Sequence, residues 1–292
     1  MGAGKTKRPT QNLAAGRPPV LKKPQSMSRK STRALINSLH NLEKRKQQAT
    51  ARGDDAEIAR ITAEVVALGG IDKYQQASLQ GQRRDRGGDS SSVLLNWLKP
   101  IEPSIRPPAA TFTLRMLEVG ALSTSNACAR SRLFDVERID LNSREQGIQQ
   151  QDFMKRPLPK DDSDRFHVIS LSLVLNFVPD PTGRGDMLRR TLNFLHAPLP
   201  AFASPLDSYF PCLFMVLPAP CIQNSRYLDD AKLQEIMSCI GFEMIQAKMT
   251  QKLAYYLWRR TAAGTGAMCD LPKVQLRRGS WRNNFAIVLK PS

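Results

Sequence analysis

The sequence has few residues of the kinds that build metal centres or disulfide frameworks. Its 292 residues include five cysteines and three histidines, and no two cysteines are spaced as Cys-x-x-Cys. An odd number of widely spaced cysteines does not predict a disulfide framework. Neither the cysteines nor the histidines have the spacing of zinc ligands. We therefore expect no metal site and a reducing compartment.

Long apolar runs are also missing. The longest extends from Val168 to Val178, about eleven residues, and Ser and Asn interrupt it. A membrane-spanning helix needs roughly twenty apolar residues, and no apolar signal segment follows Met1. We expect a soluble protein with no membrane partner.

Acidic residues are scarce at both ends of the chain. The formal net charge is +17, yet residues 1–52 contain 13 Lys or Arg and a single acid, Glu43. From Arg259 onward there are seven basic residues and only Asp270, so the middle of the chain is almost neutral. Basic ends suit a polyanion such as RNA, because Lys and Arg release counterions from phosphates. Solubility or nuclear import would explain the same charge.

The N-terminal part predicts a basic disordered tail over 1–29 and a helical region over 30–99. Leucines recur at helical spacing between Ser31 and Gln48, with the basic run 44–46 expected on the exposed side. Gly53 ends this helix, Asp54 caps a second helix through about Leu68, and a third helix is possible over 73–82. Another short helix precedes prolines 100, 103, 107 and 108, which predict a linker into a domain over 100–292.

Beyond residue 100 apolar strands alternate with helices. This order predicts a doubly wound α/β fold, with a mostly parallel sheet and helices on both faces. The fourth strand reads as the most buried. The expected strands are 114–120, 136–141, 148–152, 166–173, 212–217, 242–249, 255–259 and 285–289.

Three residues at successive strand ends indicate a nucleoside site. Gly120 ends the first strand, Asp140 ends the second twenty residues later, and Asp152 ends the third. A glycine lets the backbone approach a ligand, and the acid can accept hydrogen bonds from ribose hydroxyls. No G-x-G-x-x-G is present, which disfavours NAD or FAD and favours S-adenosylmethionine. Alternatively, Gly120 is a turn glycine and Asp140 a helix cap.

Several blocks of sequence resemble the fungal 25S ribosomal RNA adenine-N1 methyltransferase family. The resemblance covers roughly residues 70–290. Its blocks are Arg-Gly-Gly-Asp-Ser-Ser at 86–91, Leu-Glu-Val-Gly-Ala-Leu-Ser-Thr-Ser-Asn at 117–126, Arg-Ile-Asp-Leu-Asn at 138–142, Gln-Asp-Phe-Met at 151–154, Ser-Leu-Ser-Leu-Val-Leu-Asn-Phe-Val-Pro at 170–179, Arg-Gly-Asp-Met-Leu at 184–188, Tyr-Tyr-Leu-Trp-Arg at 255–259 and Arg-Asn-Asn-Phe at 282–285.

The resemblance implies a class I, Rossmann-like S-adenosyl-L-methionine-dependent methyltransferase with a seven-stranded sheet. Gly120 and Asp140 carry over as cofactor contacts, and Asp152 is expected to accept from the adenine amino group. The implied partner is 25S rRNA or a pre-60S ribosomal particle in the nucleolus. A related animal branch senses S-adenosylmethionine without catalysis, so a non-catalytic sensor is the alternative. Methylation of another RNA or of a ribosomal protein is a third possibility.

Two residues after the fourth strand are candidates for holding the target base. Methylation of adenine N1 needs an unpaired base but no general base, because N1 has a free lone pair in the neutral ring. Asn176 could bond a base edge and Phe177 could stack on it. Equally, Phe177 is a core residue and Asn176 a turn residue. For the aromatic run 255–258 we expect core packing, and for 277–282 phosphate contact in a loop.

Overall fold

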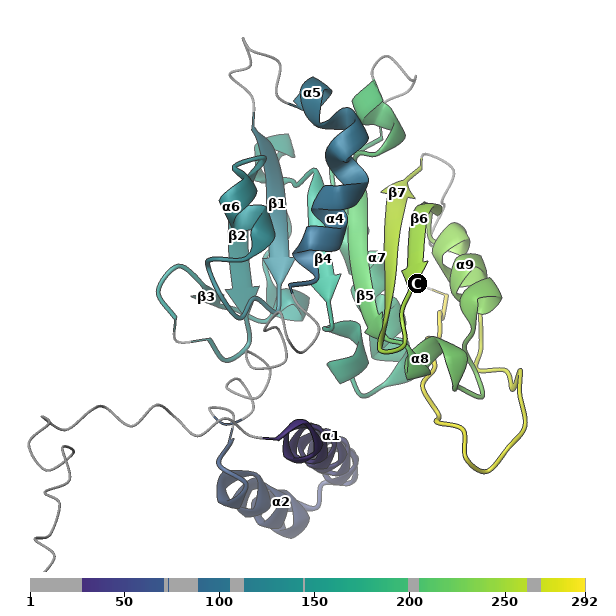
Figure 1. Cartoon of the computed structure of the whole chain (residues 1–292). Coiled ribbons are helices and arrows are strands. Elements are labelled where there is room, and N and C mark those ends of the chain that lie inside the picture. Colours follow the sequence, from purple (N-terminus) through teal and green to yellow (C-terminus); the bar gives the residue numbers. More distant parts are fainter. Residues whose placement is uncertain are drawn as a thin grey trace, which may run out of the picture.

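The computed structural model describes residues 28–70, 73, 89–105, 113–143, 145–198, 205–261 and 269–291. They form a helical hairpin and a sheet covered by helices (Figure 1). Residues 1–27 of the expected basic tail and most of the expected helix over 73–82 lie outside these residues, while Ser28 and Arg29 cap and begin the first helix. The proposed division at residues 99 and 100 stays a prediction.

The N-terminal hairpin consists of α1 (Arg29–Arg52) and α2 (Asp55–Ala67). Gly53 ends α1 in the left-handed conformation (φ 67°), and the Asp54 side chain accepts from the Glu57 amide. Glycine adopts this conformation without a side-chain clash, and an aspartate satisfies a free amide of the next helix. The predicted hairpin and both of its turn signals are therefore confirmed.

One expectation for the hairpin is wrong. Arg45, in the middle of the basic run 44–46, is part-buried and pairs with Glu57 at 2.8 Å and Glu64 at 3.2 Å. Because both carboxylates belong to α2, Arg45 joins the two helices instead of lying on the exposed side.

Seven strands form one sheet in the order β3-β2-β1-β4-β5-β7-β6, and only β7 is antiparallel to its neighbours. This confirms the predicted doubly wound, mostly parallel fold. The strands are β1 (Leu114–Val119), β2 (Phe134–Asp140), β3 (Gln149–Gln150), β4 (Val168–Ser172), β5 (Cys212–Pro218), β6 (Phe242–Met249) and β7 (Leu253–Arg260).

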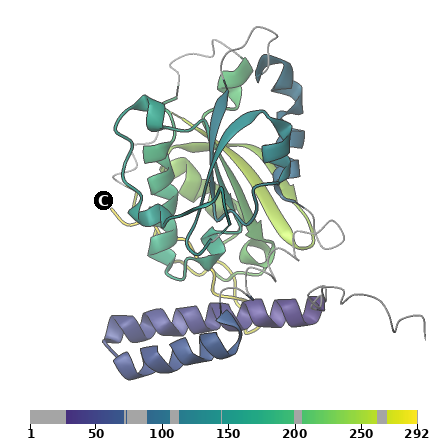
Figure 2. The same cartoon turned by 90° about the vertical axis from the view of Figure 1, so that its left-hand side faces the viewer.

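Helices cover both faces of this sheet, as Figure 2 shows edge-on. One face packs on α4 (Ser91–Leu98), α5 (Glu102–Ile105) and α6 (Ala127–Ser131). The other packs on α7 (Pro181–Phe194), α8 (Pro220–Gln223) and α9 (Asp230–Cys239). Along β5, Phe214 joins the first apolar cluster and Leu213 the second. A parallel strand buried on both faces is apolar at every position for this reason.

Four expectations about local structure need correction. Residues 285–289 form no strand, although Leu289 pairs with Leu271 in an isolated bridge. The most buried strand is β5, which is apolar throughout, whereas β4 contains two serines. Pro100 and Pro103 stand in the first turns of short helices, where a missing N–H costs no hydrogen bond. A disulfide joins Cys239 to Cys269, which the cysteine spacing did not predict.

The aromatic run in β7 is buried, as expected. Tyr255, Tyr256 and Trp258 are each at most 5% exposed. The Tyr256 hydroxyl donates to Asp230 on α9, and its burial raises the pKa of the phenol. These rings therefore belong to the core and offer no surface for stacking RNA bases.

Candidate functional site

The sheet has a switch point where strand order reverses on either side of β1. The chain runs outward from β1 to β2 and β3, then returns to place β4 on the other side of β1. In open α/β sheets a crevice forms at this point beyond the carboxyl ends of the strands. At this edge Gly120 follows β1, Asp140 is the last residue of β2, and Asp152 comes two residues after β3.

Gly120 makes a turn that no other residue type fits well. Its φ is 73°, and an added Cβ would lie 2.6 Å from Cγ2 of Val174. Its amide donates to the Ile139 carbonyl at 2.8 Å, and the Ala121 amide donates to the same oxygen at 3.2 Å. The turn therefore runs beside the end of β2. The backbone of Gly120, which carries no side chain, faces the segment that follows β4.

A small pocket opens at this turn. Its lining comes from three parts of the chain: the segment before α4, the end of β1 with its following loop, and the end of β4. The lining residues are Asp89, Ser90, Glu118, Val119, Gly120, Leu122, Ser123, Asn126 and Ser172.

The segment before α4 closes one side of the pocket. The Ser90 and Ser172 hydroxyl oxygens are 2.8 Å apart in a hydrogen bond. Asp89 accepts from the amide of Ser91 at 3.0 Å and from the amide of Ala127, which begins α6. Asp89 thus fixes the first turns of two helices, because a carboxylate satisfies their free amides.

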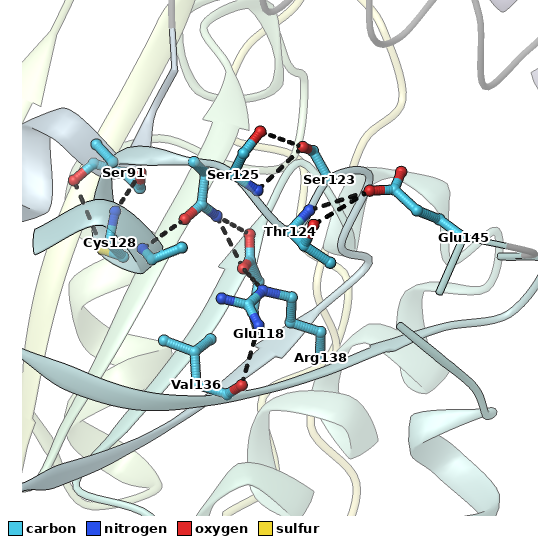
Figure 3. Close-up of polar contacts among 12 residues, drawn as sticks. Ser91, Glu118, Ser123, Thr124, Ser125, Cys128, Val136, Arg138 and Glu145 are labelled. Atoms are coloured by element: carbon cyan, nitrogen blue, oxygen red, sulfur yellow. Dashed lines mark hydrogen bonds and ion pairs between the residues drawn. The ribbon is translucent and has the colours of Figure 1, made fainter. Parts of the chain in front are cut away.

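Glu118 supplies a second carboxylate to the pocket wall. The Asn126 amide group donates to both of its oxygens at 2.7 and 2.8 Å. The Arg138 Nε lies 3.7 Å away (Figure 3). Burial is the largest influence on this carboxyl group and raises its pKa, while the Asn126 bond and the Arg138 charge oppose that shift. A partly buried carboxylate in this setting suits a cationic group on a ligand.

The two predicted ligand acids come together through the backbone. β1 and β2 pair in register up to Val119 and Ile139, so Asp140 lies next to Gly120. The amide of Gln151 donates to the Asp140 carbonyl at 2.9 Å, which brings the segment before Asp152 alongside. Each acid also bonds locally: Asp140 accepts from the Asn142 amide and Asp152 from the Met154 amide, both at 2.8 Å. Their roles as cofactor contacts stay predictions.

The predicted base-holding residues lie across the crevice from Asp140. Asn176 and Phe177 belong to a short 3-10 helix after β4, and Leu173 before it has φ 59°. A leucine in this conformation is strained, and such strain is found at functional sites. The Asn176 Oδ1 atom is buried and accepts no hydrogen bond from any described residue. An unused buried acceptor at this position suits a ligand donor.

Of the nine lining residues, Gly120 alone was predicted as a site residue. The other eight include two polar residues of the strands, Glu118 and Ser172, and two of the segment before α4, Asp89 and Ser90. Glu118 and Ser172 lie within strands that the sequence predicts, two residues or fewer from their ends. Charged and polar residues in otherwise apolar strands were the available signal. Asp89 and Ser90 could not be assigned in this way, because only the fold brings them to β4.

Within the described ranges, no group of three His, Cys, Asp or Glu side chains could hold a metal ion. Nor is any described helix both long and apolar enough to cross a bilayer.

A family description and two sequence relatives name a 25S rRNA adenine-N1 methyltransferase. Residues 59–287 match the family described as 25S rRNA (adenine(2142)-N(1))-methyltransferase, Bmt2. The Saccharomyces cerevisiae protein named 25S rRNA (adenine(2142)-N(1))-methyltransferase is 35% identical over 256 residues, 86% of this chain and 70% of that protein. The Schizosaccharomyces pombe 25S rRNA adenine-N(1) methyltransferase is 38% identical over 260 residues, 87% of this chain and 89% of that protein.

Among solved structures, the 16S rRNA methylase RmtB aligns with a TM-score of 0.43 at 12% identity, covering 75% of this chain and 90% of that one. The sequence relatives are much closer. With a family match over most of its length and two relatives above 30% identity, the chain belongs to the 25S rRNA adenine-N1 methyltransferase family.

Proposed function

We propose that the protein transfers the methyl group of S-adenosyl-L-methionine to N1 of an adenine in 25S rRNA. The observation that carries this proposal is the Gly120 turn, whose bare backbone lies beside Asp140 at the switch point of a doubly wound sheet. Membership of the family supplies the reaction and the substrate class.

The residues at this edge fit the methyl donor. Gly120 leaves the space that a nucleoside needs, and Asp140 would accept from its ribose hydroxyls. Asp152 would accept from the adenine amino group. Glu118 and Asp89 add negative charge to the wall, which offsets the positive sulfonium and ammonium groups. Bound there, the cofactor supplies an electrophilic methyl group.

The protein's task at the target is to position the base. The N1 lone pair of neutral adenine attacks the methyl carbon as the carbon–sulfur bond breaks, and the positive charge passes from sulfur to the adenine ring. No proton has to leave first, so the reaction needs no general base. Asn176 would hold the extruded base through its free Oδ1, which can accept from the adenine N6 amino group. Phe177 would stack on the ring.

We also propose that the substrate is rRNA within an assembling pre-60S particle, in the nucleolus. The charge at both ends of the chain supports an RNA partner, since 20 of its 43 basic residues fall in residues 1–52 and 259–292 together with two acids. Fluorescence microscopy of the tagged protein with a nucleolar marker tests the location.

Mass spectrometry of nucleosides from 25S rRNA tests the function. Deleting the gene should remove N1-methyladenosine from the rRNA, and re-expressing the protein should restore it. The purified protein should transfer labelled methyl groups to unmodified 25S rRNA. Unchanged N1-methyladenosine in the deletion strain would contradict the proposal. Cofactor binding without any transfer would support the sensor instead.

A further inference from the structure

The C-terminal segment 269–291 carries the most exposed large aromatic side chain in the described part of the chain. Trp281 is 69% exposed, whereas the other two tryptophans, Trp97 and Trp258, pack in the core clusters. A single exposed apolar residue is common on protein surfaces, so the surroundings of Trp281 decide whether its ring serves a ligand.

This ring is held in place by its own segment. The Arg282 guanidinium lies over the Trp281 ring, 4.4 Å from its centroid. A Cβ added to Gly279 would lie 3.2 Å from the indole nitrogen of Trp281. Because glycine has no side chain, the ring can lie close to the backbone of the loop. Arg282 Nε also donates to the Arg278 carbonyl at 3.0 Å. One face of the ring is thus paired with a cation, and the exposed remainder can accept a second flat group.

The loop itself is fastened to the segment that follows α8. Arg226 donates to the Gly279 carbonyl from both Nε and Nη2, at 3.1 and 2.9 Å. Arg277 donates to the carbonyls of Ile222 and Leu228, and its own amide donates to the Arg226 carbonyl. Arg277 is therefore a structural residue, which corrects the expectation that it contacts phosphate.

The position of the loop relates it to the methyltransferase site. α8 follows the carboxyl end of β5, so the loop lies at the same edge of the sheet as Gly120, below α8 and α9 in Figure 1. Buried Arg184 links the two regions: it donates to the Val178 carbonyl at 2.7 Å and to the Ala286 carbonyl at 2.6 Å. Val178 follows Asn176 and Phe177 directly, and Ala286 lies five residues after Trp281.

The charge around Trp281 suits a polyanion. Four arginines gather there, Arg226, Arg277, Arg278 and Arg282, and within the described ranges none of them forms an ion pair with a carboxylate. Arg278 is exposed, and its side chain makes none of the bonds that hold the loop. Aromatic rings between unpaired arginines are typical of proteins that bind single-stranded nucleic acid.

We propose that Trp281, backed by Arg282, is a stacking platform for an unpaired nucleotide of the RNA substrate, with Arg278 contacting the adjacent phosphate. The proposal rests on the RNA methyltransferase function and assigns a contact outside the pocket that takes the target base. Holding a neighbouring nucleotide beside α8, at the same edge of the sheet as the crevice, would keep the RNA strand open near the adenine that must be extruded.

Binding of a fluorescently labelled single-stranded RNA oligonucleotide by the full chain tests this contact. Trp281→Ala should weaken binding about tenfold, because stacking on one aromatic ring contributes on this scale. Trp281→Phe should retain most of the affinity. A fully paired duplex of the same sequence should bind the wild type and Trp281→Ala equally, since its bases are not free to stack. Leu276→Ala is the matched control, an exposed apolar residue of the same loop (39% exposed) that should leave binding unchanged.

The salt dependence of binding separates stacking from charge. Arg278→Ala should lower the slope of log K against log salt concentration by about one, whereas Trp281→Ala should leave that slope unchanged. If the wild type binds and methylates RNA and Trp281→Ala binds single-stranded RNA with the same affinity, Trp281 is not a stacking platform. A wild-type protein that neither binds nor methylates rRNA would instead overturn the function on which it rests. Cofactor affinity, measured in parallel, shows that each variant is folded.

Discussion

The two ends of the parallel strands use polar residues differently. At the amino end they complete the fold. Arg115 donates to the Arg165 carbonyl and stacks on Phe166, and Arg260 donates to three carbonyls at the end of α7. At the carboxyl end, Glu118 and Asp89 line a pocket and Asn176 keeps a buried oxygen without a described partner. Glu118 and Asp89 have partners within the protein and also border the pocket, so a ligand can contact them there.

Positive φ values do not follow this contrast. Gly120 and Leu173 have them at the carboxyl end, after β1 and β4, and Arg132 and Gly241 have them at the amino end, before β2 and β6. The polar groups carry the comparison: substitutions at the carboxyl end should reduce activity more than stability, and those at the amino end should do the reverse.

The largest effect should come from Gly120→Arg. The new side chain would begin 2.6 Å from Val174 in a backbone conformation that arginine rarely adopts, and it would fill the space meant for the cofactor. We expect methyl transfer to fall at least 100-fold, with no measurable cofactor binding in calorimetry. Gly120→Ala combined with Val174→Ala should recover part of the binding lost in Gly120→Ala, because it removes the atom that clashes. Normal transfer by Gly120→Arg would exclude this pocket as the cofactor site.

At the amino end, Arg260→Ala should destabilise the protein without affecting the chemistry. Its Nη1 donates to the carbonyls of Leu192, Leu195 and His196 at 3.0, 2.7 and 2.7 Å. Leaving carbonyls at a helix end without donors should lower the free energy of unfolding by about 2–3 kcal/mol, measured by urea denaturation. Arg60→Ala is the control, since that arginine is exposed and its one ion pair should contribute less than about 0.5 kcal/mol. Cofactor affinity should be unchanged in both variants.

Glu118→Gln tests whether the negative charge of this carboxylate in β1 contributes to cofactor binding. Glutamine can keep a bond to Asn126 but loses the negative charge, so we expect cofactor affinity to fall about tenfold. Glu137→Gln on β2 is the matched control, because Glu137 pairs with Arg156 at 2.6 Å and does not line the pocket. Equal losses of cofactor affinity in the two variants would show that removing any carboxylate from this sheet weakens binding, and would contradict a specific role for Glu118.

The sequence predicted those features of the two ends that depend on residues close together in the chain. Strand periodicity located β1, β2 and β4, and the spacing of Gly120 and Asp140 reflects the loop after β1, the short helix α6 and the strand β2. Contacts between distant segments could not be predicted in this way. Asp89 reaches the pocket only because α4 packs on the sheet, and Arg184 joins Val178 to Ala286 across about a hundred residues. The stretch 285–289 is apolar like a strand, but it packs on α7 at Gly185, where an added Cβ would be 2.0 Å from the Val288 carbonyl oxygen.

The smallest effect is a pH dependence that arises at the amino end. His167 accepts a hydrogen bond from the Arg115 amide through Nδ1 and stacks on His196, with ring centroids 4.3 Å apart. Burial, with the charges of His196 and Arg115 adding to it, lowers the pKa of His167 to about 4. The unfolded chain therefore binds the proton more readily than the folded one. Stability should be complete above about pH 6.5 and should decline as the pH falls from 6.5 towards 4.

Allowing for solvent screening, this loss should amount to about 1 kcal/mol between pH 7 and pH 5. Urea denaturation at several pH values measures it. His167→Asn places an uncharged acceptor near Nδ1 and should flatten the dependence, while cofactor affinity at pH 7 should stay at the wild-type value because His167 lies at the end of β4 remote from Gly120. If His167→Asn shows the same pH dependence of stability as the wild type, other groups cause it. If His167→Asn binds the cofactor less tightly, the two ends of the strands do not have separate roles.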